Sequence, residues 1–475
     1  MKTADRSIRV SLLALGIAAA IGLPALARAQ TSGASGQTSA TEQQLERRVE
    51  QLEQELSQLK AEIQAQRQAQ ASAPAPVAAQ TVAAQPVAAS PAPPAFTTAP
   101  GMSVALHGFI SASAFNQSKS FSYGNGQNAE YPVPGSTGSL SGVDIRSTRF
   151  WLDWTGARFA GEWTGGGRIE MDFFGGFNGT GPYSQQQPVP RLRQAYMDLA
   201  NPAAGTTVRI GQQWDLMYPL DNLPASLAHL SFPLGFGTGF VGWRFPGIVW
   251  MQELNHGSGG PVWRLDLGAF EGSWNGPNGA VNNTNYLTAG NAGFRPQVEA
   301  RLRVQGSDWL AYLAAHYSRV DLRGVGNTAP APLASEITSW GYQLGGQWKP
   351  GPWTFKAAAY AGRGLGELFG GLSQFGDIQD RGGFVQAGYG FTPHWSGNVF
   401  YGISKPGARD VRRWMGNGAT GLIESRQAAV NLEYAAGAYE LGVEWMRDSL
   451  DWLAPNNATK STSGNQLSLS ALYRF

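Results

Sequence analysis

From residue 103 to the carboxy terminus, apolar residues alternate with small or polar residues at a period of two. In segment 297–304, Val298, Ala300, Leu302 and Val304 alternate with Gln297, Glu299, Arg301 and Arg303. Such alternation places successive side chains on opposite faces of a β-strand. The runs are close to the roughly 9–11 residues that a tilted transmembrane strand needs. The pattern predicts sixteen strands, at residues 103–115, 143–154, 162–174, 191–199, 207–214, 240–253, 262–271, 296–304, 309–320, 336–348, 353–363, 381–391, 394–404, 426–434, 439–447 and 465–475.

The gaps between these segments alternate in length. Short gaps such as 305–308 and 392–393 take turns with long ones such as 116–142 and 215–239. Outer-membrane barrels have short periplasmic turns and long extracellular loops. A soluble β-sandwich would explain the alternating residues but not the alternating loops. The sequence therefore predicts an all-β transmembrane barrel of about sixteen antiparallel strands over residues 101–475, in a Gram-negative outer membrane with both barrel ends on the periplasmic side.

The predicted strand 240–253 contains Pro246. Proline has no N–H to donate to a strand ladder, and a closed barrel has no edge strand where this would be harmless. We therefore expect a bulge at Pro246 or a strand that starts after it.

The first 29 residues have the pattern of a secretory signal peptide. An apolar run from Leu12 to Leu23 follows three basic residues and precedes Ala27-Arg28-Ala29, a small-x-small cleavage site. The run is too short to span a bilayer as a helix. Without residues 1–29, which hold four basic residues and one acidic residue, the chain keeps 31 basic and 32 acidic residues. The sequence pI of about 8.7 therefore gives no reason to expect nucleic-acid binding.

Residues 42–67 form three heptads that predict a parallel coiled coil. The a positions are Val49, Leu56 and Ile63, and the d positions are Leu45, Leu52 and Leu59. The g and e positions pair opposite charges: Arg48 with Glu53, Glu55 with Lys60, and Glu62 with Arg67. One amphipathic helix docked on the barrel would explain the apolar stripe but not the paired charges. The run from Arg48 to Glu53 also resembles a short motif of trimeric coiled coils, so these residues are expected to join three copies in the periplasm.

Residues 68–100 are rich in Ala, Pro, Gln and Val and end in Pro91-Ala92-Pro93-Pro94. This composition cannot build a core and is typical of an extended linker. A passive linker is expected, with a segment that crosses the cell wall as the alternative.

A sixteen-stranded barrel encloses an aqueous channel. Function is therefore expected on inward-facing charged residues, which lipid would penalise. Arginine walls guide carboxylates and phosphates by forked hydrogen bonds, whereas arginines neutralised by neighbouring acids would only shape the lumen. With 27 basic and 26 acidic residues in the barrel segment, net charge does not decide between these two possibilities. The predicted pore-lining residues are Arg149, Arg168, Glu170, Asp172, Arg193, Arg209, Asp215, Asp221, Arg264, Glu299, Arg301 and Arg303.

The long gap 215–239 is unusually apolar for an external loop. It is expected either to fold into the lumen or to pack between subunits. In the first case Asp215 and Asp221 could face the arginines across a narrow pore.

An enzyme is not expected. The five histidines show no HExxH spacing, no GxSxG motif occurs, and the glycine clusters precede no helix that could bind phosphate. With no cysteine, thiolate metal sites and cysteine catalysis are excluded. We therefore predict no metal and no cofactor.

Several short segments resemble known porins. The ending Tyr473-Arg474-Phe475 resembles the signal that the barrel-assembly machinery reads, and Val104-Ala105-Leu106-His107-Gly108-Phe109 resembles the first strand of general porins. The segments 168–173, 193–196 and 211–214 resemble strands of phosphate-selective and DcaP-like porins. A coiled coil before the barrel fits the DcaP-like trimeric outer-membrane porins best.

This resemblance implies a homotrimer for passive uptake of small hydrophilic solutes, often anions such as dicarboxylates. The lysine ladder of phosphate-selective porins is not evident, which argues against phosphate. An alternative function is a structural tether, in which the coiled coil engages the cell wall or a periplasmic partner while the barrel only anchors it.

Overall fold

The computed structural model describes residues 95–99, 101–123, 130–176, 186–228, 239–271, 284–285, 290–291, 295–321, 333–334, 336–369, 371–372, 376–418 and 420–475. The chain divides into two compact units, Met1–Val82 and Ala83–Phe475, and every described residue belongs to the second. The predicted signal peptide 1–29, coiled coil 42–67 and most of the linker 68–100 lie outside the described residues.

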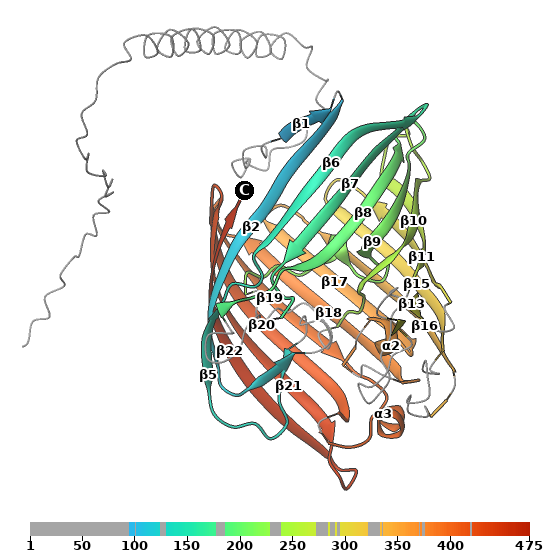
Figure 1. Ribbon diagram of the computed structural model, residues 1–475. Coiled ribbons are helices and arrows are strands. Elements are labelled where there is room, and N and C mark those ends of the chain that lie inside the picture. The colour runs from blue at the N-terminus through green and yellow to red at the C-terminus, as the bar shows by residue number, and fades with distance from the viewer. Residues whose placement is uncertain are drawn as a thin grey trace, which may run out of the picture. The chain divides into compact units, whose positions relative to one another are not determined.

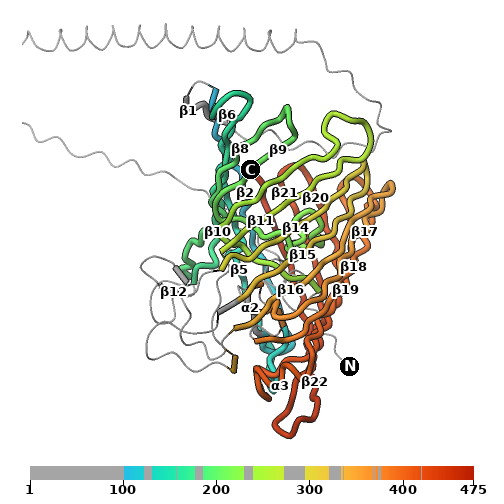
Figure 2. The backbone as a smooth tube through the Cα atoms, turned by 90° about the vertical axis from the view of Figure 1, so that its right-hand side faces the viewer, coloured from blue at the N-terminus to red at the C-terminus, as the bar shows by residue number. Residues whose placement is uncertain are grey.

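Sixteen antiparallel strands form a closed β-barrel, as predicted (Figure 1). Neighbouring strands in the chain pair with each other, and the last strand pairs with the first to close the wall. The tube in Figure 2 shows the strands inclined to the barrel axis. The strands are β2 (Met102–Gln117), β6 (Arg149–Ala160), β7 (Trp163–Asp172), β8 (Arg191–Asn201), β9 (Thr206–Trp214), β10 (Arg244–Glu253), β11 (Val262–Phe270), β14 (Gln297–Gln305), β15 (Trp309–Asp321), β16 (Glu336–Trp348), β17 (Trp353–Arg363), β18 (Gln379–Gly390), β19 (Trp395–Ser404), β20 (Leu422–Ala436), β21 (Tyr439–Leu453) and β22 (Thr459–Arg474).

Short elements complete the described structure. β1 (Ala95–Ala99), at the end of the predicted linker, pairs with the start of β2. β5 (Leu140–Asp144) continues β6 along β2 beyond a turn at residues 145–148. β3 (Phe121–Tyr123) pairs with β4 (Glu130–Pro132), and β12 (Thr284–Asn285) pairs with β13 (Gly290–Asn291). No helix among the described residues is long and apolar enough to span a membrane.

Short and long connections alternate as predicted. The turns that join β6 to β7 and β20 to β21 lie at the barrel edge that also holds the carboxy terminus, at the top of Figure 1. The longer connection between β19 and β20, which contains α3 (Ala408–Trp414), lies at the opposite edge. One predicted long loop, 448–464, shrinks to residues 454–458 because β21 and β22 continue with polar residues. Alternation of apolar and polar residues stops where a strand leaves the membrane, so it underestimates the length of such strands.

Strand β10 contains Pro246 without a bulge, so both expectations for this residue were wrong. β10 starts at Arg244 and pairs with β9 in continuous register, with Pro246 opposite Gln212. The Pro246 carbonyl accepts a hydrogen bond from the backbone N–H of Glu271, at 2.8 Å. Because N–H and C=O of one strand residue point to the same neighbour, the missing N–H of Pro246 faces the end of β11. The ladder with β11 only begins at Gly247, so little pairing is lost.

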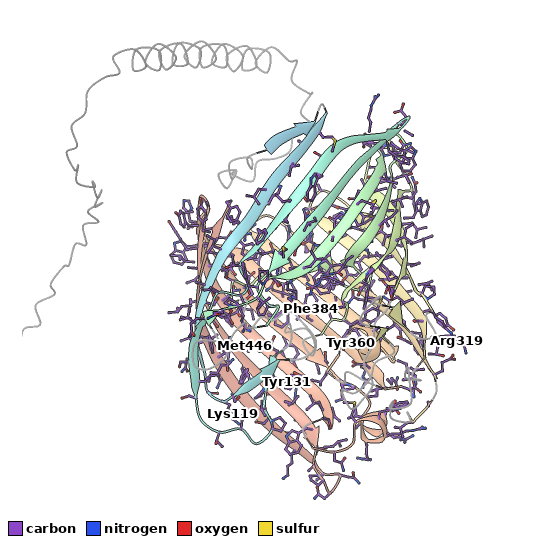
Figure 3. All side chains as sticks on the ribbon, viewed as in Figure 1. Lys119, Tyr131, Arg319, Tyr360, Phe384 and Met446 are labelled. Carbon is purple, nitrogen blue, oxygen red and sulfur yellow. The ribbon has the colours of Figure 1, made fainter. Side chains whose placement is uncertain are left out.

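The outer and inner faces of the wall differ in polarity, as expected for a barrel in a membrane. Large apolar side chains cover the outer face, and polar side chains are buried inside. Exposed outer residues include Leu344, Val385, Val399, Leu441 and Leu469, and buried inner ones include Gln343, Gln386, Gln427, Asp448 and Gln466. Figure 3 shows the side chains on the wall and labels the buried Tyr360, Phe384 and Met446.

The carboxy terminus takes part in closing the barrel. The backbone N–H of Gly108 donates to the carbonyl of Phe475 at 2.9 Å, and the N–H of Phe475 donates to the carbonyl of Gly108 at 3.0 Å. Tyr473 pairs with Ile110 on the outer face of the same seam. The final residue is therefore part of the seam between β22 and β2.

Replacing Gly211 by alanine is expected to destabilise the barrel. Gly211 in β9 has φ +130, and an added Cβ would lie 2.3 Å from the carbonyl oxygen of Ala195. Backbone strain and overpacking should together cost about 2 kcal/mol or more. The measurement is the temperature at which the folded band disappears in heat-modifiability electrophoresis, which should fall. Gly259→Ala is the control, because nothing lies within 4 Å of its added Cβ. An equal transition temperature in both variants would contradict the assigned conformation.

Candidate pore constriction

The segment 215–243, here called the constriction loop, leaves the end of β9 at Asp215. The Asp215 N–H donates to the carbonyl oxygen of Trp243 at 2.9 Å, so the two ends of the loop lie side by side. The Asp215 carboxylate accepts hydrogen bonds from the backbone N–H of Tyr218, at 2.7 Å, and of Trp243. Burial, followed by the nearby Glu299 carboxyl, raises the pKa of Asp215 well above its ordinary value. Asp215 holds the base of the loop together and does not face the arginines, so that expectation was wrong.

The described part of the loop follows the inner wall from β17 to β18. After η3 (Leu220–Asn222), the Asn222 amide donates to the carbonyl of Ala357 at 2.7 Å. Gln386 accepts from the N–H of Ala225 at 2.8 Å and donates to its carbonyl at 3.0 Å. In the strand order of the closed wall, β17 and β18 lie across the barrel from β9, so the loop that leaves β9 is held by the opposite side.

Residues 226 and 227 fasten the loop to the wall near the seam. Ser226 Oγ donates to Glu444 Oε2 on β21 at 2.6 Å. Leu227 packs with Phe109 of β2 and Leu472 of β22, and all three are buried. The described residues of the loop therefore fold into the lumen, and the alternative of a loop between subunits does not apply to them.

A second apolar segment also lies inside the barrel. The connection between β17 and β18 contains α2 (Gly366–Phe369), and Phe369 is fully buried. Its ring contacts Phe245 of β10, at 6.2 Å between centroids, and His316 of β15, at 4.6 Å. α2 thus fills the inner side of β10 and β15, and the sequence analysis did not predict it.

The wall formed by β6 to β9 carries forked pairs of arginine and aspartate. Arg168 donates through Nε and Nη2 to both carboxylate oxygens of Asp153, at 2.7 and 2.9 Å. Arg209 binds Asp198 in the same way, at 2.7 and 2.8 Å. Each pair joins two neighbouring strands, so both arginines are neutralised by acids. This is the arrangement in which arginines only shape the lumen.

A β-bulge in β8 concentrates charge at one level of this wall. The register between β7 and β8 shifts so that Arg193 and Gln194 both point inward, and both are buried. Arg193 binds Glu170 at 2.5 Å and Asp172 at 2.7 Å, and Gln194 binds the other oxygen of Glu170 at 2.5 Å. Bulges re-aim side chains in this way, and this one gives Glu170 two partners from a single strand.

Positive charge exceeds negative charge around this bulge. Arg191 forks onto Asp172 at 3.0 and 2.7 Å, and Arg149 approaches Glu170 at 3.6 Å. The Arg244 guanidinium lies close to two tryptophan rings that are nearly perpendicular to each other, 4.7 Å from the Trp214 centroid and 4.5 Å from the Trp243 centroid. Arg193 lies over the same Trp214 ring, at 5.7 Å. Three arginines therefore pair with two carboxylates, and Arg244 lies next to them over the Trp214 ring that Arg193 also contacts. We call this set the arginine cluster: Arg149, Arg191, Arg193 and Arg244 with Glu170 and Asp172.

Two polar atoms of this cluster are unsatisfied. Among the described residues, Nε of Arg149 and Nη1 of Arg244 have no hydrogen-bond partner, although both atoms are buried. A buried guanidinium donor without an acceptor is costly. The cluster therefore has both spare charge and spare donors.

A second charged group joins the wall to the loop. On β11 and β14, Arg264 and Arg301 both bind Asp266. Arg303 Nε lies 3.2 Å from Asp221 of the constriction loop, whose side chain is 38% exposed. Asp221 therefore faces an arginine, as the sequence suggested.

The predicted site residues fall into two groups. Glu299 accepts from the N–H of Leu216 at 2.6 Å and contacts His316 at 3.1 Å, so like Asp215 it is buried at the base of the loop and lines no open pore. The others form ion pairs on the inner wall or the loop: Arg149, Arg168, Glu170, Asp172, Arg193, Arg209, Asp221, Arg264, Arg301 and Arg303.

Residues that the sequence analysis missed belong mainly to the anchoring of the loop. Gln386 and Glu444 show only the usual inward alternation, which carries no sign of a loop partner. Arg244 was missed because the segment that contains it was considered only for the effect of Pro246 on strand pairing. The adjacent Trp243 and the distant Trp214 were the available signal, since arginine stacks on tryptophan faces.

The barrel has the fold of outer-membrane porins. The outer-membrane channel DcaP of Acinetobacter baumannii superposes with a TM-score of 0.57 and 20% identity, covering 80% of this chain and 99% of that one. OmpF of Salmonella typhi, in a complex with daunomycin, gives a TM-score of 0.50 and 12% identity, covering 80% and 100%. No protein-family model and no curated protein matches this sequence.

A disulfide between residues 227 and 442 should form without disturbing the fold. A Cβ built on Gly442 would lie 3.3 Å from the Cβ of Leu227, near the roughly 3.5–4.5 Å found in disulfides. Because the chain has no native cysteine, Leu227→Cys with Gly442→Cys gives one possible bridge. Non-reducing electrophoresis of trypsin fragments should show it after mild oxidation. Leu227→Cys with Gln213→Cys on β9 is the matched control, and a bridge in the control alone would overturn the loop position.

Proposed function

We propose that this protein is an outer-membrane porin through which small hydrophilic solutes diffuse passively. The observation that carries the proposal is a closed barrel whose lumen is lined with charges and narrowed by a loop fixed to the inner wall. Sixteen strands leave an aqueous channel, and the outward apolar surface requires lipid. The fold shared with DcaP and OmpF supports the same role. We also propose that Tyr473 and Phe475 are read by the barrel-assembly machinery, and that the barrel ends face the periplasm.

We further propose that the pore prefers small anions such as carboxylates. The preference comes from the arginine cluster and not from the number of arginines on the wall, because most of the others are matched by acids. The excess positive charge of this cluster attracts carboxylates in the lumen. The side chains of Arg149 and Arg191 are 28% and 19% exposed, so an anionic solute beside them is attracted by this local excess of positive charge.

We propose that the channel is a homotrimer joined at residues 42–67 and at the outer face of β7 to β9. The large apolar residues exposed on these three strands are Ile169, Leu192, Met197 and Ile210, none of them aromatic. Lipid-facing strands carry aromatic residues at the membrane interfaces. The far side of the barrel does so, with Trp309, Tyr317, Trp340, Trp348, Trp353, Trp395 and Tyr401 exposed. A second copy of the chain, rather than lipid, would suit the aliphatic face.

Neutralising two members of the cluster should reduce anion preference. Arg149→Gln with Arg191→Gln removes two positive charges and leaves Glu170 and Asp172, so the chloride-to-potassium permeability ratio should at least halve. Reversal potentials in planar bilayers across a KCl gradient measure it. The control is Arg168→Gln with Asp153→Asn, which removes one matched pair and leaves the net charge of the lumen unchanged. An unchanged ratio in the first variant would remove the cluster from the selectivity of the pore.

Deleting residues 42–67 should weaken assembly without changing the pore. Light scattering of the purified protein should show fewer trimers, while the conductance of each barrel in planar bilayers stays the same. Deletion of residues 70–90 of the linker is the matched control and should leave assembly intact. If the deletion of 42–67 leaves the trimer unaffected but detaches the membrane from the cell wall, the tether is the better account.

A further inference from the structure

The outer face of β20 to β22 changes abruptly from apolar to polar toward the long-loop edge. Cross-strand neighbours Leu432, Val443 and Leu469 form one apolar row, and Val430, Trp445 and Leu467 form the next. The row after that is Ala428, Arg447 and Asn465, followed by Arg426, Ser449 and Ser463. Arginine thus enters the outer face directly where the apolar belt ends.

A hollow of about 540 Å³ lies at this boundary. Lys119, Arg426 and Arg447 line it together with one carboxylate, Asp451, and the ring of Tyr401. Its walls also carry hydroxyl groups from residues 461–463. Three cations and several hydroxyls converge on a cavity that opens on the outside of the barrel.

The positive charge of the hollow is only partly matched. Arg426 binds Asp451 at 3.0 Å and Glu424 at 3.1 Å. Arg447 donates to Ser463 Oγ at 3.2 Å, and Lys119 donates to Thr462 Oγ1 at 3.0 Å, so both bind a neutral hydroxyl.

The adjoining surface adds to this excess. Lys405 shares Glu424, and an adjacent hollow of about 450 Å³ contains Arg381 with Lys405. Across both hollows, five cations face two carboxylates: Lys119, Arg381, Lys405, Arg426 and Arg447 against Glu424 and Asp451.

We propose that this hollow binds the phosphate groups of a glycolipid in the outer leaflet. Cations at the edge of an apolar belt avoid the cost of burial in hydrocarbon while reaching the headgroup level. Guanidinium groups bind phosphate by forked hydrogen bonds. The apolar rows directly below, including Val430 and Trp445, would contact the acyl chains of the same molecule. A soluble phosphate would use the cations but not these rows, which is why the proposal commits to a lipid.

The inference rests on the outer-membrane location proposed above but not on solute passage. The hollow lies on the outer face of the wall, so the selectivity of the pore does not depend on it. Lipid binding and conductance are therefore separate measurements, and either proposal can fail alone.

The test is native mass spectrometry of the full-length chain, purified in detergent and titrated with bis-phosphorylated lipid A or with lipid A stripped of both phosphates. Arg426→Ala with Arg447→Ala should lower the affinity for the phosphorylated form at least about tenfold, because the loss of even one of the two charge-assisted contacts is worth about that factor. Arg426→Lys with Arg447→Lys should retain most of it. Arg319→Ala is the matched control, since Arg319 is exposed on the other side of the barrel (Figure 3) and is bound to Glu336. Heat-modifiability electrophoresis confirms that every variant is folded.

Three kinds of result would overturn the proposal. The first is the absence of an expected difference, either equal affinity for both forms of lipid A or an unchanged affinity in the double alanine variant. The second is displacement of lipid A by an equal concentration of inorganic phosphate, which would assign the hollow to a free anion. The third is a disulfide between two copies of a Ser463→Cys variant in membranes, which would place a second chain over the hollow.

Discussion

Inside a membrane, a backbone N–H or C=O group without a partner costs several kcal/mol, and lipid offers it none. Every strand in this protein must therefore have a neighbour on both sides, and the pairing of β22 with β2 is what provides the last one. The alternation of side chains follows from the same closed wall, because each strand has one face toward lipid and one toward the lumen. The reciprocal hydrogen bonds between Gly108 and Phe475 show that this requirement extends to the final residue.

Closure also determines where polar chemistry can occur. The outer face accepts charge only at the level of the headgroups, and the inner face accepts it everywhere. On the inner face most charges are matched in cross-strand pairs such as Arg168 with Asp153. These pairs shape the lumen without giving it a net charge. The bulge in β8 breaks this pattern by placing two inward side chains beside each other. Selectivity, in this view, depends on the place where the regular wall is interrupted.

The strands could be predicted because period two and loop length are local properties of the sequence. The number of strands, their order and the inward position of Arg168, Arg193 and Arg209 all follow from them. The contacts of Asp215 and Glu299 could not be predicted, because an acidic residue on an inward-facing position looks the same whether it lines the pore or supports a loop. Their neighbours, such as Trp243 and Leu216, come together only in the folded barrel. Pro246 was misjudged since its effect depends on which neighbouring strand its missing N–H faces.

The packing of Leu227 has a consequence for the order of folding. Leu227 contacts Phe109 of the first strand and Leu472 of the last one, so its binding place does not exist until these strands have met. Burying such a side chain contributes about 1.5–3 kcal/mol, and that contribution becomes available only after the ring of strands is complete. Leu227 can therefore dock only after the seam between β22 and β2 has closed, and its burial then opposes reopening of that seam.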